Sequence, residues 1–411
     1  MILGGDIGAY SAARAFHEAY GVRSVVVSGV ATGVVRHSRI ITNVVEPGID
    51  DAERVVARLR SVAADHPGRR VLLGSADWLV RTIVENRAAL EDLYVIPYTD
   101  RETLDRVTDK ESFGALCSDL GLGHPTTVVH DVGAGGAPDT SGLRFPVIAK
   151  AGDTATYHRL EFPGKKKVFT VDTPAELADL LERMRSAGYT GTFVIQDLIP
   201  GDDSGMRILT CYCDAGGRMR FASFGHVLLE EHTPGALGNP AGIITGGDAD
   251  IVDQARRLLE HIGWSGYANF DLKYDPRDGR TVFFELNPRL GRSNFYITAA
   301  GRNTVELYVR EHLQGLDPLP AGEPEQLTTE HLYTVLPRPL LLRYVADPAL
   351  RRRVRRLFNR RRATNPLWYS AERDPRRLAY LVIAQLNQFR KYYRHYPRPS
   401  RRAAVATEVS A

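Results

Sequence analysis

Acidic side chains interrupt two strongly apolar segments that a short turn joins. Asp271 falls within residues 267–274 and Glu285 within residues 281–286, and the pattern of both segments predicts the two strands of a hairpin. Asn287 lies two residues beyond Glu285, and the alternation of side chains along a strand places both on one face. Three oxygen-bearing side chains are therefore expected to converge.

This ligand set is typical of a magnesium site. Mg²⁺ prefers hard oxygen ligands and usually keeps one or two protein carboxylates, while phosphates and water complete its shell. Arg289 lies on the same face and is suited to bind a γ-phosphate or an acyl phosphate. A hairpin with an exposed face and a salt bridge is the alternative. The polar residues stand inside an apolar run, which favours the metal site.

The motif Glu-x-Asn-x-Arg resembles the closing strand of the ATP-grasp family, in which the preceding strand supplies another acid. The resemblance implies Asp271, Glu285 and Asn287 as metal ligands and Arg289 as a catalytic contact to the transferred phosphoryl group. It implies ATP and Mg²⁺ as cofactors, with Mn²⁺ as the alternative metal. The implied fold is an open parallel α/β domain followed by two α+β lobes that clamp ATP.

Three lysines resemble the phosphate contacts of this family. Lys110 lies at an expected helix start, and Lys150 ends the predicted strand at residues 145–150. Lys167 closes a glycine and lysine run at residues 164–167, where the family carries a flexible loop. The resemblance implies that all three bind the nucleotide and that Lys150 also acts in catalysis. Taken alone, each is compatible with a solvated surface charge.

Residues 193–203 resemble the hinge between the two lobes of the family. Gln196, Asp197 and Leu198 are the implied contacts to the edge of adenine, and Asp203 is the implied contact to ribose. For Asp203, an ordinary acidic turn is the alternative, because a second aspartate stands beside it.

Residues 4–8, which follow the first predicted strand, read Gly-Gly-Asp-Ile-Gly. The spacing is not G-x-G-x-x-G, and the second strand ends in Ser28 without an acid for a ribose, so a dinucleotide site is not favoured. ATP-grasp enzymes resemble this arrangement in their first domain, where the loop helps to bind the acid substrate. Asp6 is therefore the implied substrate contact, together with Gly5 and Tyr10.

Longer stretches resemble one branch of the bacterial carboxylate–amine ligases, the D-aspartate ligases. These stretches include residues 4–18, 164–167 and 287–296 and parts of the tail. Enzymes of that branch activate D-aspartate as an acyl phosphate and join its side-chain carboxyl to the ε-amine of the diamino acid in a peptidoglycan precursor. Arg292, Ser293 and Asn294 follow the metal strand and are expected to hold the α-carboxylate of the acid. The identity of the acid rests on the resemblance alone.

Two other functions stay open. Another ATP-grasp reaction, such as biotin-type carboxylation or D-alanine-type peptide ligation, would use the same nucleotide machinery. A nucleotide-binding protein that keeps the ATP-grasp shape without catalysis is the second. The intact metal strand argues against it, since such a descendant has no need of the ligands.

The order of the expected elements indicates five regions. An open parallel α/β domain spans residues 1–105, and two α+β lobes follow at residues 106–190 and 191–335. A basic helical extension occupies residues 336–396, and residues 397–411 are expected to be disordered.

The charge of the chain is unevenly distributed. From Pro337 onward, 19 Lys and Arg stand against 4 Asp and Glu, so this tail carries +15 and the preceding residues carry −11. Residues 378–393 have an amphipathic pattern. Two interpretations stay open for the tail: peripheral docking on an anionic membrane, near a lipid-linked precursor, or a helical cap over the fold. Nucleic acid is not an expected partner, because no recognition fold is visible.

The composition is that of a globular protein, with 43% hydrophobic and 25% charged residues in 411. The chain starts without a basic and apolar leader and has no run of eighteen apolar residues, so we expect a cytoplasmic location. Cys117, Cys211 and Cys213 are expected to be reduced packing residues. The sequence does not indicate an oligomeric state.

Overall fold

The structure is a computed structural model that describes residues 1–66, 68–152, 157, 160–166 and 168–397. The chain forms two compact units. Unit 1 comprises Met1–Thr108, Asp202–Leu272 and Glu285–Ala411, and unit 2 comprises Asp109–Gly201 and Lys273–Phe284. The predicted disordered tail, residues 397–411, lies outside the described residues except for Pro397.

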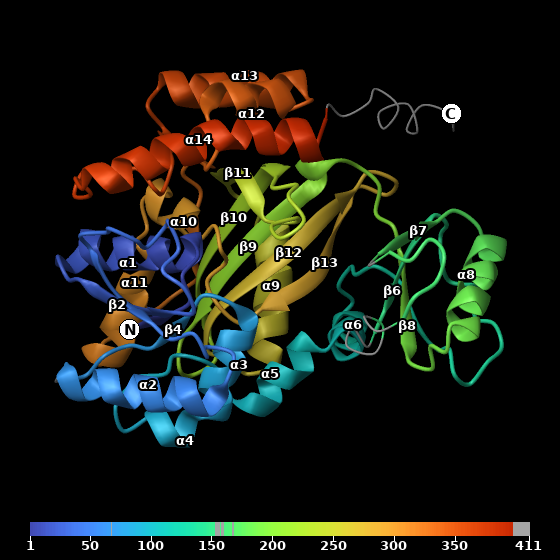
Figure 1. Ribbon diagram of the computed structural model, residues 1–411, viewed down its shortest axis with the longest axis horizontal. Helices are drawn as coiled ribbons and strands as arrows, with labels where there is room; N and C mark the ends of the chain where they lie inside the picture. Colours follow the sequence, from blue (N-terminus) through green and yellow to red (C-terminus); the bar gives the residue numbers. More distant parts are fainter. Residues whose placement is uncertain (67, 153–156, 158–159, 167, 398–411) are drawn as a thin grey trace. The chain divides into compact units, whose positions relative to one another are not determined.

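Unit 1 begins with a four-stranded parallel sheet in the order β3-β2-β1-β4 (Figure 1). Its strands are β1 (Ile2–Leu3), β2 (Ser24–Ser28), β3 (Ile41–Val45) and β4 (Leu73–Gly74). β-Branched valines fill β2, and both Val26 and Val27 are fully buried, as expected for a strand with helices on both faces. The predicted open parallel α/β domain is confirmed.

Two helices lie between strands of this sheet in the chain, and three more follow β4. They are α1 (Ile7–Tyr20), α2 (Ala52–Asp65), α3 (Asp77–Glu85), α4 (Arg87–Leu90) and α5 (Arg101–Thr108). Asp6 caps α1 by accepting a hydrogen bond from the amide of Ala9 at 2.9 Å, and Asp51 caps α2 in the same way. The face of α1 that carries Tyr10 and Ala13 is buried, so the strand-end loop before α1 has a fixed position.

A second sheet of eight strands follows in unit 1, and the far ends of two of its strands extend into unit 2. Along the sheet the order is β13-β12-β9-β10-β11-β15-β16, with β14 paired to β10. The strands are β9 (Met206–Cys213), β10 (Met219–Glu230), β11 (Pro240–Gly246), β12 (Gly266–Asp275), β13 (Arg280–Asn287), β14 (Glu325–Leu327), β15 (Leu332–Thr334) and β16 (Ala363–Thr364). The helices between them are α9 (Ala249–His261), α10 (Phe295–Ala300) and α11 (Thr304–Tyr308). All three cysteines of the chain are buried and unpaired.

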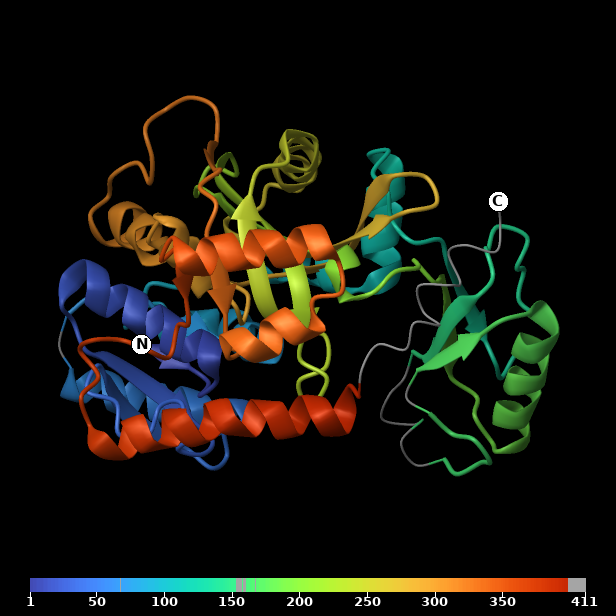
Figure 2. The ribbon, with the colours of Figure 1, turned by 90° about the horizontal axis from the view of Figure 1, so that it is seen from above.

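The C-terminal helices complete unit 1. They are α12 (Arg338–Tyr344), α13 (Pro348–Asn359) and α14 (Pro375–His395), and Figures 1 and 2 show them gathered on one side of unit 1. No helix in the described part of the chain is both long and apolar enough to cross a bilayer.

The tail packs against the N-terminal helix α1. Arg14 donates hydrogen bonds to the carbonyls of Pro366 and Trp368 at 2.7 and 3.1 Å. Arg377 of α14 is fully buried and lies 4.3 Å from the ring centre of Tyr10. These contacts join residues more than 350 positions apart, so the tail is an integral part of the fold.

Unit 2 is a smaller α+β body. Its antiparallel sheet has the order β5-β8-β6-β7, with β5 (Thr127–Asp131), β6 (Val147–Ala151), β7 (Phe169–Val171) and β8 (Thr192–Asp197). The described helices are α6 (Lys110–Asp119) and α8 (Pro174–Ser186). Phe193, Ile195 and Met184 are fully buried and centre its core.

Candidate active site

The predicted metal ligands converge on the neighbouring strands β12 and β13. Asn287 donates a hydrogen bond to Oδ2 of Asp271 at 3.1 Å and another to the carbonyl of Asn269 at 3.3 Å. Asp271 and Glu285 are close enough for their carboxyls to share a hydrogen bond. The alternation of side chains thus brings the three predicted ligands together.

The electrostatics of this cluster suit a divalent cation. Burial raises the pKa of Asp271 well above its usual range, and the neighbouring Glu285 carboxylate raises it further. A bound cation would relieve the repulsion between two carboxylates held this close. No group of three His, Cys, Asp or Glu residues suited to a metal exists among the described residues. The donor set here is two carboxylates and one amide oxygen, which fits Mg²⁺ with its remaining positions on phosphate and water.

Arg289, the predicted phosphoryl contact, is held by an acid that sequence reasoning missed. Asp77, at the start of α3, accepts a hydrogen bond from Nη2 of Arg289 at 3.0 Å and lies 2.9 Å from its Nε. Nη2 also lies 3.4 Å from Oδ1 of Asn287. This hydrogen bond and the close approach of the two charged groups hold the guanidinium beside the predicted metal ligands. The only signal for Asp77 as a site residue is its position at the N-terminus of a helix.

Arg292 and Asp6, both predicted substrate contacts, are brought together in unit 1. Nε of Arg292 lies 3.8 Å from Oδ2 of Asp6, and its Nη1 donates to Glu231 at 2.5 Å. Burial alone would lower the pKa of Arg292, but the Glu231 carboxylate outweighs this effect and raises it. Glu231 was missed, because it stands in an ordinary charged run after β10.

Ser293 and Asn294 form the buried turn that follows Arg292. Asn294 donates hydrogen bonds to the carbonyls of Gly8 and Gly291 at 3.2 and 2.9 Å, so its amide ties this turn to α1. A Cβ on Gly8 would lie 3.2 Å from the Cα of Arg292, and the absence of a side chain allows the two segments to approach. Oδ1 of Asn294 and Oγ of Ser293 are buried without a hydrogen-bond partner among the described residues.

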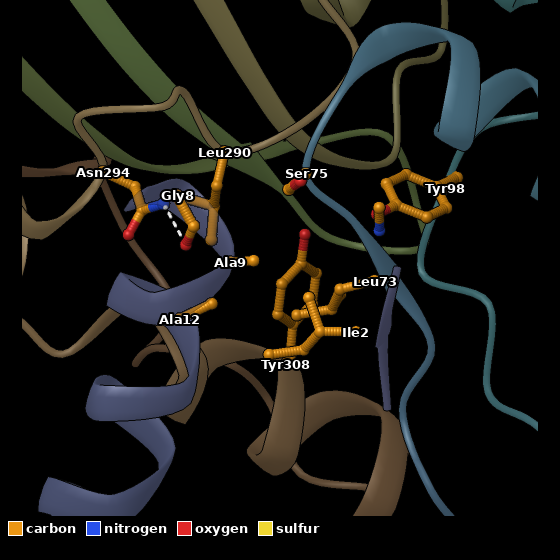
Figure 3. A pocket seen from close by; sticks show the side chains of 11 residues that line it. Ile2, Gly8, Ala9, Ala12, Leu73, Ser75, Tyr98, Leu290, Asn294 and Tyr308 are labelled. Atoms are coloured by element: carbon orange, nitrogen blue, oxygen red, sulfur yellow. Dashed lines mark hydrogen bonds between the residues drawn. The ribbon is translucent and has the colours of Figure 1, made fainter. Parts of the chain in front are cut away.

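A pocket opens where α1, β1 and β4 meet this turn (Figure 3). Its wall is formed by Ile2, Gly8, Ala9, Ala12, Leu73, Gly74, Ser75, Tyr98, Leu290, Asn294 and Tyr308. The hydroxyl of Tyr98 accepts a hydrogen bond from the amide of Gly74 at 2.8 Å. The pocket lies at the carboxyl ends of parallel strands, which is a common place for small ligands in α/β sheets.

The predicted phosphate lysines lie in unit 2, apart from one that the structure does not describe. Lys110 is exposed in the first turn of α6, and Lys150 is partly buried in β6, where it pairs with Val194 of β8. Lys167 lies outside the described residues.

The predicted adenine contacts also belong to unit 2, at the end of β8. Gln196 donates a side-chain hydrogen bond to Thr127 at 3.0 Å, and the amide of Leu198 donates to the carbonyl of Pro146 at 3.3 Å. The Asp197 carboxylate is buried and accepts from the amide and Nε of Arg144 at 2.8 and 3.0 Å. The side chain of Asp197 therefore stabilises this corner of unit 2, and its amide donates to the carbonyl of Thr126 at 2.9 Å. A contact of residues 196–198 with adenine stays a prediction.

Asp203, the predicted ribose contact, lies in unit 1. Its Oδ2 accepts a hydrogen bond from the amide of Glu230 at 2.9 Å and is 2.8 Å from Nε2 of His232. The ring of His232 stacks on Tyr396, with ring centres 3.7 Å apart. These contacts fix the carboxylate, and its role toward ribose stays a prediction.

Comparison with known proteins gives this geometry a context. No family model matches the chain. It is 29% identical over 407 residues to the D-aspartate ligase of Enterococcus faecium (strain Aus0004), with 96% of each chain covered. Its similarity to this ligase therefore extends along nearly the whole chain.

Solved structures of ATP-grasp proteins resemble it over most of its length. The L-amino acid ligase from Bacillus licheniformis matches with a TM-score of 0.54 and 16% identity, covering 76% of this chain and 73% of that one. The biotin carboxylase complex with β-γ-ATP from Campylobacter jejuni matches with a TM-score of 0.57 and 13% identity, covering 80% and 74%. The predicted ATP-grasp fold is therefore confirmed.

Proposed function

We propose that this ATP-grasp ligase activates the side-chain carboxylate of D-aspartate with ATP and joins it to the side-chain amine of the diamino acid in a peptidoglycan precursor. The observation that carries the reaction type is the cluster of Asp271, Glu285 and Asn287 with Arg289 beside it. The choice of acid and amine is supported by the similarity to D-aspartate ligase along 96% of the chain.

The residues of the cluster explain how the first step proceeds. Mg²⁺ bound there would neutralise charge on the phosphates of ATP. Arg289, oriented by Asp77, donates to the oxygens of the γ-phosphoryl group as the substrate carboxylate attacks phosphorus. The bond from the γ-phosphorus to the bridging oxygen breaks, ADP leaves, and an acyl phosphate remains.

Positioning dominates the second step. The amine attacks the carbonyl carbon of the acyl phosphate, inorganic phosphate leaves, and the nitrogen loses its proton to solvent or base. Arg292 is suited to hold the α-carboxylate of the acid, because its guanidinium is partly buried and oriented by Glu231 and Asp6. No covalent intermediate with a protein side chain is needed.

The nucleotide contacts remain part of the proposal. Lys110, Lys150 and Lys167 would bind phosphates. The backbone at residues 196–198 would contact adenine, and Asp203 would contact ribose.

The test is phosphate release from ATP and Mg²⁺ across a panel of D- and L-amino acids, with and without a peptidoglycan-precursor pentapeptide. Release that requires both D-aspartate and the pentapeptide supports the proposal. Release with another acid retains an ATP-grasp ligase and removes the D-aspartate assignment. Absence of release with every pair favours a nucleotide-binding protein without catalysis.

A matched pair of variants tests the cluster. Glu285→Ala should abolish release, whereas Glu323→Ala, which removes an exposed acid from the loop before β14, should leave it unchanged. Equal activity of the two variants would contradict the metal assignment.

A further inference from the structure

Helix α14 has a buried face and an exposed face, and both carry large side chains. Its inner face carries Arg377, Leu381 and Tyr392, which are buried in unit 1. Arg377 donates to the carbonyl of Val34 at 2.6 Å, and Tyr392 donates to the carbonyl of Glu230 at 2.5 Å. These contacts anchor both ends of the helix, so its orientation on unit 1 is fixed.

The outer face of α14 leaves large apolar side chains in solvent. Ile383 and Leu386 are each 64% exposed. Leu378, Val382, Leu386 and Tyr393 recur at intervals of four, four and seven residues and form one stripe, which we call the outer stripe of α14. Exposed apolar side chains in a continuous row are unusual on a protein surface that touches only water.

Positive charge accompanies the outer stripe. Arg376, Arg390 and Arg394 are exposed on the same helix, and no Asp or Glu occurs between Pro375 and His395. At 100° per residue these arginines fall along one side of the stripe, next to Ile383. Figure 2 shows α14 along an edge of unit 1, with α12 and α13 on one side of it.

We propose that the outer stripe of α14 docks on the surface of an anionic lipid bilayer. Aliphatic side chains enter the boundary between headgroups and acyl chains, and the flanking arginines bind anionic headgroups. Because the helix is already folded and anchored by its inner face, docking requires no folding step. The surface is separate from the cluster at Asp271 and does not depend on the proposed reaction.

The chemistry of the stripe favours lipid over two other partners. A second copy of the chain in an antiparallel two-fold contact would bring the same arginines to one edge of the contact, which is repulsive. A nucleic acid would be recognised by aromatic stacking, whereas the most exposed side chains here are Ile383 and Leu386.

The experiment is sedimentation of the full chain with vesicles of phosphatidylcholine alone or with 30 mol% phosphatidylglycerol, at about 50 and 300 mM NaCl. The expected result is binding that requires phosphatidylglycerol and weakens with salt. Arg376→Gln, Arg390→Gln and Arg394→Gln together should weaken binding roughly a hundredfold. Ile383→Ser with Leu386→Ser should abolish stable binding even at low salt.

A matched control removes the same charge elsewhere. Arg60→Gln, Arg101→Gln and Arg257→Gln change three exposed arginines outside the tail and should leave vesicle binding within about threefold of the parent. Circular dichroism and tryptophan emission check that each variant is folded.

Three results would overturn the proposal. The first is no binding to phosphatidylglycerol vesicles, and the second is an equal loss in the control variant, which would indicate only a diffuse charge effect. The third is a dimer in light scattering that Ile383→Ser with Leu386→Ser converts to a monomer, because the stripe would then be covered by a second copy.

Discussion

Replacing Glu285 with glutamine should make the protein more stable and much less active. The change keeps the shape of the side chain and one oxygen but removes one of two carboxylates that share a hydrogen bond. In the absence of metal these two groups oppose each other, so their proximity is a cost to the fold that ligand binding recovers.

The size of the effect follows from elementary electrostatics. Two unit charges about 4 Å apart repel by about 4 kcal/mol at an effective dielectric constant of about 20. Because the pKa of Asp271 is raised, the pair holds a proton to higher pH than an isolated aspartate does, which relieves part of this repulsion. We therefore expect Glu285→Gln to raise the free energy of unfolding of metal-free protein by about 1–2 kcal/mol.

The effect has a pH signature with a definite sign. A carboxyl whose pKa is raised in the native state holds a proton that the unfolded chain has already released, so its contribution to stability is present at acidic pH and is lost as the pH rises. The difference in unfolding free energy between Glu285→Gln and the parent should accordingly be larger at pH 8 than at pH 5.

The assay is urea unfolding in EDTA, followed by tryptophan emission. The three tryptophans, Trp78, Trp264 and Trp368, all belong to unit 1, so the signal reports on the unit that contains the carboxylate pair. Turnover with Mg²⁺, measured as phosphate release, should fall at least roughly a hundredfold. A lower urea midpoint for the variant at pH 8, or turnover near that of the parent, would refute this reasoning.

Three further predictions concern the residues around the site. Arg289→Lys retains the charge but loses the planar guanidinium that Asp77 and Asn287 hold, so kcat should fall roughly a hundredfold while the KM for ATP changes little. A change confined to that KM would contradict the assignment. Arg292→Lys should raise the KM for the acid roughly tenfold or more and lower kcat by a smaller factor. Steady-state kinetics with the acid varied measures both, and a larger change in kcat than in KM would contradict the assignment. Gly4→Ala should lower the free energy of unfolding clearly more than Gly21→Ala does. Both positions have positive φ, but only at Gly4 would a Cβ collide with another atom, a serine oxygen at 2.0 Å. Equal urea midpoints of the two variants would show that the collision relaxes.

The meeting of Asp271, Glu285 and Asn287 could be predicted from the sequence because its geometry is local. Side chains on one strand alternate, so Glu285 and Asn287 share a face of β13, whereas Arg289 lies in the turn that follows the strand. The position of Asp271 next to these residues could be predicted because a short turn joins the two strands in a hairpin. The structure places β12 beside β13. The parallel and antiparallel sheets could likewise be predicted from the periodicity of apolar residues and from the presence or absence of helices between strands.

The partners of the site residues could not be predicted, because they come from distant segments. Asp77 precedes Arg289 by 212 positions, and Glu231 precedes Arg292 by 61. Asp197 illustrates the opposite difficulty: its place in a hinge-like motif suggested a ligand contact, while its carboxylate is bound by Arg144, 53 positions earlier. Nothing local in the sequence distinguishes a side chain that will bind a ligand from one that will bind the protein.

The amphipathic tail shows a third limit of sequence patterns. Residues 378–393 were predicted either to dock on a membrane or to cap the fold, since periodicity reveals an apolar face but not what covers it. In the structure, α14 has one buried face and one exposed face, and both carry apolar side chains. In the sequence these two sets of apolar residues merge into one amphipathic pattern.

The contacts between α1 and the tail have a consequence for biosynthesis. Arg14 and Tyr10 emerge early from the ribosome, but the carbonyls and the guanidinium that they contact lie beyond Asn365 and are translated last. At about 5–20 residues per second, the nascent N-terminal domain waits roughly 20–80 s for these partners. During that time Arg14 lacks its two carbonyl acceptors and has only Glu18 as a partner, and the apolar face of its helix is incompletely covered, which is the state that chaperones recognise. A chain that stops before Pro366 would lack these carbonyl acceptors and would leave Arg14 paired with Glu18 alone.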